Sequence, residues 1–328
     1  MKKITSFWTV LLFLCPMIIF CCTDDEYKVP KGNTALFNDC IKRTVGPNMV
    51  GLNLEFAYAM ALGPEKGKLI SAQVEASIAG APETYLEHRS FYTNMSGVDI
   101  PITVGEPSTT NAAITKVIFT SDTCAATLRY YYRIPEEARG KSVSFTFSAE
   151  ASTGEKVSFK SDSYEVAKMD MQLDIVLSDN DKCYLSVADM TAYNAAEAAS
   201  NSAKIDLVYL YRAITGISFN HALVSPSNTE YLPEVTLPAG VSNRTSYWKV
   251  WGLRDRHLAR LQYGVYVDDL DFQKMDFTGA PDYGLDMKLE SGAWVETSDR
   301  KYRAYIYVNN VNNSTREMTV SIKRYPLN

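Results

Sequence analysis

Three histidines, His88, His221 and His257, are the side chains best suited to acid–base chemistry near neutral pH. None has a nucleophile or second ligand at a spacing typical of a hydrolase or metalloenzyme, and the HExxH, GxSxG and Walker-type patterns are absent. Glu87 directly precedes His88, so on a strand the two would point to opposite faces. For His221 we expect a structural hydrogen bond to the backbone. We therefore predict a protein that is not an enzyme. A glycoside-directed enzyme is an alternative, because its paired carboxylates need no closeness in sequence.

The densest group of carboxylates is Asp268, Asp269 and Asp271. The alternation of apolar residues slips across this group, which indicates a strand with a β-bulge, or a strand end, within residues 264–272. Carboxylates that converge at such a point could bind Ca²⁺, although the residue order of an EF-hand is missing. The competing interpretation is that these aspartates are solvated or cap a turn. We expect no other cofactor.

Aromatic residues indicate a ligand-binding surface in the second half of the chain. If residues 247–251 form a strand, Tyr247, Lys249 and Trp251 lie on one face, while Trp248 and Val250 lie on the other and suit the core. The rings of Tyr247 and Trp251 would then stand roughly 13 Å apart, at about 3.3 Å per residue. An exposed pair of this kind could stack on sugar rings or hold an extended peptide.

The same alternation near the C-terminus exposes either Tyr305 and Tyr307 or Tyr302 and Ile306. We take Tyr305 and Tyr307 as further candidate ligand contacts. The competing interpretation is that all these aromatic side chains pack in a core or form a protein–protein face, since strands favour aromatic residues in both settings.

Cysteines are few outside the N-terminal segment. Cys40, Cys124 and Cys183 show no CxxC pattern and no metal-like spacing. Cys40 and Cys124 could pair in an oxidising compartment, and three unpaired, mostly buried thiols are the simpler interpretation.

The composition is that of a folded protein with a mildly acidic surface. The net charge is −5, with 46% hydrophobic and 22% charged residues among 328. An acidic balance without a basic stripe argues against a nucleic-acid partner.

The elements that must position these side chains are mostly β-strands. Apolar and polar residues alternate over 128–133, 142–148 and 169–177, and further strand candidates follow up to residue 324. Short helices are expected at 35–42, 192–200 and 255–261. We predict an all-β protein with two β-sandwich domains (immunoglobulin-like or jelly-roll-like), over 32–166 and 167–328. The second is the candidate ligand-binding domain.

The N-terminus carries a targeting pattern. Two lysines precede an apolar stretch over 7–20 that is too short to span a membrane, followed by Cys21-Cys22 and an acidic run. This arrangement resembles a bacterial lipoprotein signal, with a signal peptide over 1–21 and an acidic tether over 22–31. Cys22 is the favoured acylation site, because Cys21 then supplies the small residue before the cut; Cys21 is the alternative. The resemblance implies anchoring to the outer membrane through acyl chains, with the protein exposed at the cell surface. A periplasm-facing lipoprotein is the alternative.

Several segments of the second half resemble a family of Bacteroidetes two-domain surface lipoproteins of unknown function. They are 205–209, 221–226, 250–255, 302–308 and 320–325. Members are often found beside a TonB-dependent importer of the starch-utilisation type and its lid lipoprotein, and some are labelled lipid-binding. The resemblance implies a non-enzymatic accessory subunit that binds a nutrient, either an oligosaccharide or a peptide, for an outer-membrane import system. The alternatives are a binder of lipid or another apolar molecule, and a structural or adhesion protein.

Overall fold

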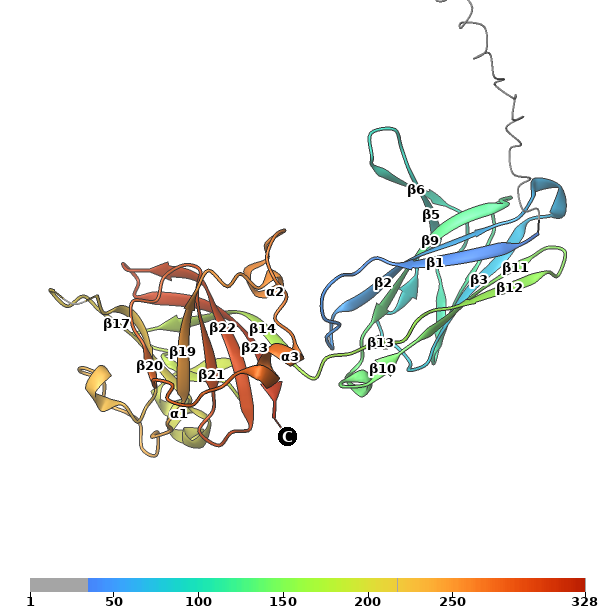
Figure 1. The fold of residues 1–328 in the computed structure, drawn as a ribbon. Coiled ribbons are helices and arrows are strands. Elements are labelled where there is room, and N and C mark those ends of the chain that lie inside the picture. The colour runs from blue at the N-terminus through green and yellow to red at the C-terminus, as the bar shows by residue number, and fades with distance from the viewer. Residues whose placement is uncertain (1–34, 217, 328) are drawn as a thin grey trace, which may run out of the picture.

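Two β-sandwiches follow one another along the chain in the computed structural model, which describes residues 35–216 and 218–327 (Figure 1). The predicted all-β class with two sandwich domains and a few short helices is confirmed. The predicted signal peptide, tether and acylated cysteine lie outside the described residues. No helix within the described ranges is long and apolar enough to span a membrane.

The N-terminal domain consists of two antiparallel sheets whose inner faces meet. Its core is rich in rings: Phe56 lies 4.9 Å from Phe145 and 5.3 Å from Phe147, measured between ring centres. The first sheet contains, in spatial order, β1 (Phe37–Lys42), β2 (Asn53–Ala61), β9 (Ala125–Arg133) and β4 (Tyr85–Leu86). The second contains β12 (Lys156–Lys160), β11 (Phe145–Ala151), β3 (Leu69–Ala76), β8 (Ile114–Ile118) and β7 (Thr109–Asn111).

Smaller elements complete this domain. The hairpin of β5 (Arg89–Thr93) and β6 (Asp99–Thr103) stands away from the sandwich, as Figure 1 shows. A second pair is formed by β10 (Ser142–Val143) and β13 (Tyr164–Glu165). Two short 3₁₀ turns cover Pro64–Lys66 and Glu136–Ala138.

The C-terminal domain also pairs two antiparallel sheets around a core. The first sheet runs β14 (Asp170–Ser178), β23 (Glu317–Pro326), β22 (Tyr302–Asn312), β21 (Ser291–Glu296) and β19 (Ser246–Trp251). The second runs β16 (Thr191–Tyr193), β15 (Tyr184–Ser186), β17 (Leu207–Arg212), β18 (Asn220–Val224) and β20 (Tyr283–Gly284). Its helices are α1 (Ala195–Ser200), α2 (Arg256–Ala259) and α3 (Asp269–Lys274), with 3₁₀ turns at Ser202–Lys204 and Thr229–Tyr231.

Both sheets of the C-terminal domain are covered on both faces. One apolar cluster fills the space between the sheets and includes Ile306 and Val320. A second cluster covers the outer face of the first sheet, where Phe272 of α3 packs with Trp294 and Tyr305. A third covers the outer face of the second sheet. Residues at both odd and even positions of β22 are therefore buried, unlike those of a strand with one wet face.

Two predicted elements are wrong. The helix predicted over 35–42 is absent, and Phe37–Lys42 form strand β1, because pairing with β2 along the whole length of β1 satisfies the backbone. Its apolar spacing suits either element, and tertiary pairing decides between them. The strand predicted over 264–272 is instead a single β-bridge at Val265 followed by α3. The expected helices at 192–200 and 255–261 contain α1 and α2.

The junction between the domains is built from specific contacts. Asp269 of α3 accepts hydrogen bonds from the backbone amides of Lys168 (2.7 Å) and Met169 (3.2 Å). Met49 of the N-terminal domain is buried in the same apolar cluster as Phe272. The segment between the domains is therefore held on both sides by folded structure.

Candidate ligand-binding site

The predicted aromatic surface is largely core. Tyr247, Tyr305 and Tyr307 are all buried, so the expectation that they face solvent is wrong. Tyr247 points between the sheets, and its hydroxyl contacts the sulfur of Met287 at 3.3 Å. Tyr305 packs against Trp294, with 4.8 Å between ring centres, and its hydroxyl donates to the carbonyl of Leu253. Burial raises the pKa of the Tyr305 hydroxyl well above its usual range.

The other two predicted contacts do reach solvent, but they do not form a platform with the tyrosines. Trp251 is 63% exposed at the end of β19. Lys249 is exposed as well, and its Nζ donates to the carbonyls of Leu285 (2.6 Å) and Asp286 (2.9 Å). Lys249 therefore holds a neighbouring loop, and Trp251 is the one exposed ring of the five residues named.

The aspartate cluster serves the backbone. Asp268 caps α3 by accepting from the amides of Leu270 and Asp271, and Asp271 accepts from the amide of Asp268 in return. Asp269 holds the domain junction. Within the described ranges, no group of three or more acidic, histidine or cysteine side chains is arranged to hold a metal ion. Asp268 and Asp271 thus act as the capping groups of the competing interpretation, and Asp269 binds backbone amides of the domain junction.

The three histidines occupy unrelated places. His88 Nδ1 lies 3.3 Å from Glu87 Oε1, so the prediction that these side chains diverge is wrong; residues 87–88 form a bend between β4 and β5 rather than a strand. His221 lies in β18, and the predicted hydrogen bond to backbone is wrong, because its ring bonds to side chains: Nδ1 is 2.7 Å from the Tyr209 hydroxyl and Nε2 is 2.8 Å from Asn313 Oδ1. Burial lowers the pKa of His221.

His257 is half-enclosed beside the ring of Tyr266, with 4.8 Å between ring centres. Burial, followed by the nearby Lys323 ammonium, lowers the pKa of His257 to about 4. The His257 imidazole is therefore neutral near pH 7. It forms no hydrogen bond to a carboxylate among the described residues and lines none of the pockets described below, so it is not a candidate general base.

The cysteines are free thiols. Cys40, Cys124 and Cys183 are all partly buried and unbridged. Burial raises the pKa of Cys40 to about 12 and that of Cys183 to about 11, which removes the thiolate needed for nucleophilic chemistry.

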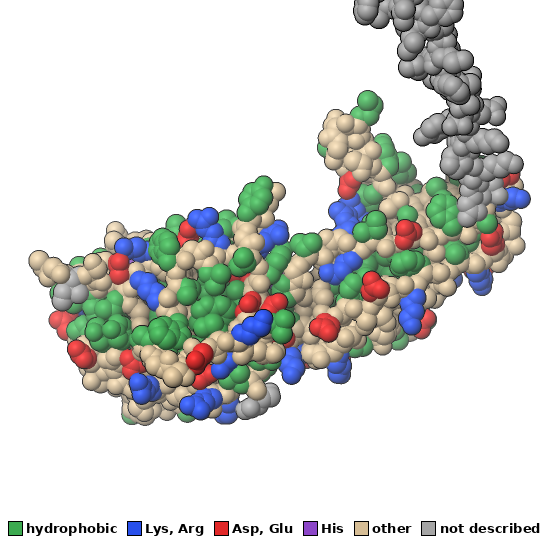
Figure 2. Space-filling model, viewed as in Figure 1, with side chains coloured by type: hydrophobic (Ala, Val, Ile, Leu, Met, Phe, Trp, Pro, Cys, Tyr) green, Lys and Arg blue, Asp and Glu red, His purple; other side chains and the backbone are tan. Residues whose placement is uncertain are grey.

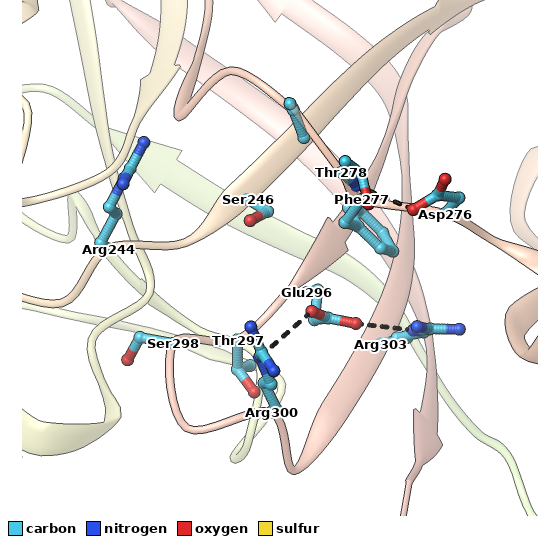
Figure 3. A pocket seen from close by; sticks show the side chains of 12 residues that line it. Arg244, Ser246, Asp276, Phe277, Thr278, Glu296, Thr297, Ser298, Arg300 and Arg303 are labelled. Atoms are coloured by element: carbon cyan, nitrogen blue, oxygen red, sulfur yellow. Dashed lines mark hydrogen bonds and ion pairs between the residues drawn. The ribbon is translucent and has the colours of Figure 1, made fainter.

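A polar pocket of about 630 Å³ lies where β19 and β22 begin and β21 ends (Figure 3). Sequence reasoning did not find it, because its residues come from segments that no motif connects. The lining combines charged groups, hydroxyls and one ring: Arg244, Ser246, Asp276, Phe277, Thr278, Glu296, Thr297, Ser298, Arg300 and Arg303, with Gly279 and Ala280.

The floor of the pocket is a fixed ion pair. Glu296 and Arg303 are cross-strand partners on β21 and β22, and Arg303 Nε lies 2.8 Å from Glu296 Oε2 (Figure 3). Arg303 also donates to the carbonyl of Phe272 at 2.7 Å and lies 5.4 Å from the centre of the Phe277 ring. Both charged side chains are largely buried. These contacts together fix the guanidinium group of Arg303 in place, so Arg303 is a rigid part of the pocket floor.

Two turns shape the rim. Asp276 accepts from the Thr278 amide at 2.9 Å, and this hydrogen bond lowers the pKa of the Asp276 carboxyl. In the turn between β21 and β22, Thr297 donates to Asp299 at 2.8 Å, and Arg300 adopts the left-handed backbone conformation (φ 55°). Arg244 and Arg300 stand on the rim and are mostly exposed.

Comparisons with known proteins agree with the division into two domains. A profile described as a domain of unknown function, DUF4466, matches residues 33–166, and another, DUF8576, matches residues 167–327. The crystal structure of a DUF4466 family protein from Parabacteroides merdae is 49% identical, with a TM-score of 0.84 over 90% of this chain and 100% of that one.

More distant solved structures include two pilins. The major pilin subunit of Bacillus cereus gives 7% identity and a TM-score of 0.29 over 88% of this chain and 66% of that one. A fragment of the major pilin of Streptococcus agalactiae gives 14% identity and a TM-score of 0.28, over 56% and 74%. Scores of this size do not indicate a shared fold. No curated protein matches the chain. On the evidence of its 49% identical relative, the chain belongs to the DUF4466 family.

Proposed function

We propose that this protein is a non-enzymatic, lipid-anchored accessory subunit of an outer-membrane nutrient importer, and that its C-terminal domain binds an oligosaccharide or a peptide. The observation that carries the proposal is the polar pocket at the ends of β19, β21 and β22. Its fixed Glu296–Arg303 floor and exposed rim arginines form a preorganised surface with spare hydrogen-bonding groups. The anchor would be Cys22, in keeping with the lipoprotein-type N-terminus.

The chemistry of the pockets supports a polar ligand over a lipid. A lipid-binding protein needs an enclosed cavity lined by apolar side chains. Three further hollows on the same domain each include charged residues, among them Asp189, Lys204 and Arg212. In the described part of the chain, the buried apolar side chains form packed clusters instead.

The hairpin of β5 and β6 supports the accessory-subunit part of the proposal. No charged residue occurs from Tyr92 to Val98, and Met95 at the tip is fully exposed. Tyr92, Val98 and Ile102 are each more than half exposed. Apolar side chains gathered on a projecting hairpin, visible as green atoms at its tip in Figure 2, are typical of protein–protein contact. The partner we expect there is the importer.

Two measurements test the two parts of the proposal. Ligand binding is measured by isothermal titration calorimetry of the mature chain against neutral and acidic oligosaccharides and short peptides. Absence of binding to every class would refute the pocket's role. Importer association is measured by pull-down of the detergent-solubilised lipoprotein, with mass spectrometry of the recovered proteins.

The hairpin offers a matched pair of variants for the pull-down. We expect recovery of a TonB-dependent importer with the unaltered chain and its loss with the double variant M95S/V98S. The variant I70S removes another exposed apolar side chain of the same domain, 39% exposed on β3, and should retain the importer. Recovery of the lipoprotein alone, or equal recovery with M95S/V98S, would contradict the hairpin's assignment.

A further inference from the structure

Arg244 and Arg300 on the pocket rim have unused hydrogen-bonding capacity. Their side chains are 74% and 83% exposed. The nearest carboxylates are Asp282, 3.6 Å from Arg244 Nε, and Glu296, 4.0 Å from Arg300 Nε. Both separations exceed hydrogen-bond length, and no hydrogen bond from either guanidinium is formed to another described residue. Each guanidinium carries five N–H donors in a planar fork that matches a carboxylate.

Glu296 does not neutralise the rim. Its Oε2 accepts from Arg303 at 2.8 Å, so its charge is already compensated by a buried partner. The lining contains three arginines against two carboxylates, Asp276 and Glu296. The lining residues themselves therefore carry a net charge of +1, on a chain whose net charge is −5. A local field of this sign attracts an anionic ligand.

The pocket lining also contains neutral hydrogen-bonding groups. The hydroxyls of Ser246 and Ser298 both line the pocket, and neither bonds to another side chain or carbonyl among the described residues. Figure 3 shows Ser246 and Ser298 on the side of the pocket where Arg244 and Arg300 stand. Paired hydroxyls and guanidinium groups are suited to a ligand that presents hydroxyl and carboxylate groups in alternation.

The lining has little to offer an acidic peptide beyond its charge. Phe277 is the one ring in the pocket, and it is 9% exposed beneath the guanidinium of Arg303. Apart from Gly279 and Ala280, the other lining residues are polar or charged, so the pocket offers little apolar surface to a side chain. A chain of acidic sugars presents hydroxyl and carboxylate groups on every ring and needs no apolar recess, so it matches this lining better than a peptide with apolar side chains.

We infer that the pocket binds a carboxylated oligosaccharide, with Arg244 and Arg300 holding the carboxylates and Ser246 and Ser298 the ring hydroxyls. This inference rests on the proposed function, because it specifies the ligand of the same pocket. The Glu296–Arg303 pair positions the floor and does not contact the acidic group of the sugar.

The decisive comparison uses one sugar chain in two charge states. Calorimetric titration of the mature protein with oligogalacturonate, oligoglucuronate and oligomannuronate should show binding of at least one, and the methyl ester of that sugar should bind at least about tenfold more weakly, equivalent to about 1.4 kcal/mol. R244Q and R300Q should each weaken binding about tenfold. R316Q removes an exposed arginine elsewhere on the domain, 3.9 Å from Asp179, and should leave binding unchanged. High salt should weaken binding of the acid and not of its ester.

The outcomes separate this inference from the function it rests on. Equal binding of acid and ester, or full binding by both rim variants, would overturn the assignment of a carboxylate ligand while leaving a sugar-binding pocket. Equal binding of tetraglutamate would overturn the sugar assignment. Binding of neutral sugars alone would also overturn it. Absence of binding to every sugar and peptide would overturn the proposed function as well. Circular dichroism of each variant shows whether a loss of binding reflects a loss of folding.

Discussion

The ion pair between Lys323 and Asp255 is fully buried, and we expect its two halves to be unequal in their effect on stability. Lys323 Nζ donates to Asp255 Oδ2 at 2.6 Å and to the carbonyl of Val267 at 2.8 Å. Neither side chain has any solvent exposure. Asp255 also accepts from the backbone amides of His257, Leu258 and Val267, so it closes the loop that carries α2.

The difference follows from what each deletion leaves behind. In K323M the Asp255 carboxylate keeps three amide donors and stays partly compensated. In D255N the new side-chain NH₂ group faces backbone N–H groups that are themselves donors. Lys323 then keeps a single acceptor, the carbonyl of Val267. Removing one partner of a buried pair costs about 3–5 kcal/mol. We expect about 3 kcal/mol for K323M and about 5 kcal/mol for D255N.

The assay is urea unfolding followed by tryptophan fluorescence. Every tryptophan of the described ranges, Trp248, Trp251 and Trp294, lies in the C-terminal domain, so the signal reports that domain alone. The double variant D255N/K323M should be less destabilised than the sum of the single variants, because it leaves no unpaired charge. A loss below about 1 kcal/mol for both single variants, or strict additivity in the double variant, would refute this account of the pair.

Three further predictions concern the burial and hydrogen bonds of individual side chains. W251A should change the free energy of unfolding by less than about 0.5 kcal/mol, whereas Y247A should lower it by about 3–5 kcal/mol; urea unfolding followed by circular dichroism measures both, and similar losses would contradict the assigned burial. Burial raises the pKa of Asp206 from 3.8 to about 7, so the folded state retains a proton that the unfolded state releases; stability should fall by up to about 4 kcal/mol as pH rises from 3.8 to 7, and D206N should remove that fall in unfolding curves recorded across this range. D269A removes the acceptor for the amides of Lys168 and Met169, so limited proteolysis should cut residues 163–170 faster than in the unaltered chain or in D271A; an unchanged rate would show that apolar packing alone holds the junction.

Much of the fold was predictable because period-two patterning survives wherever a strand has one wet face. In β2 and β9 every second residue is buried, and the alternation noted for 128–133 lies within β9.

The pattern of apolar residues predicted the wrong element in two places, for identifiable reasons. Residues 35–42 have a spacing that fits a helix or an edge strand equally, and the choice depends on β2 being present. The Asp268–Asp271 pair is a capping box, which resembles a bulged strand when only apolar alternation is read.

The site was less predictable, because exposure depends on what covers a sheet. Tyr305 and Ile306 point to opposite faces of β22, yet both are buried. The cover on one face comes from α3 and from Met49 in the other domain. No local pattern near Tyr305 reports those distant segments. The pocket was missed for the same reason: Arg244 and Arg303 line one pocket because β21 pairs with both β19 and β22, and no sequence motif connects them.

Coverage of both sheets also decides where a ligand can bind in the C-terminal domain. With both faces packed, the accessible places are the ends of strands and the edges of sheets. Along the edge strand β19, the Tyr247 amide donates to the Pro281 carbonyl at 2.7 Å, so the beginning of the strand is covered by the segment before β20. That covering segment, together with the turn after β21, forms the walls of the arginine-lined pocket. At the far end of β19, Trp251 is exposed on open surface, and no residue of the arginine-lined pocket encloses it there. The strand β19 thus has the arginine-lined pocket at its beginning and an open surface at its end.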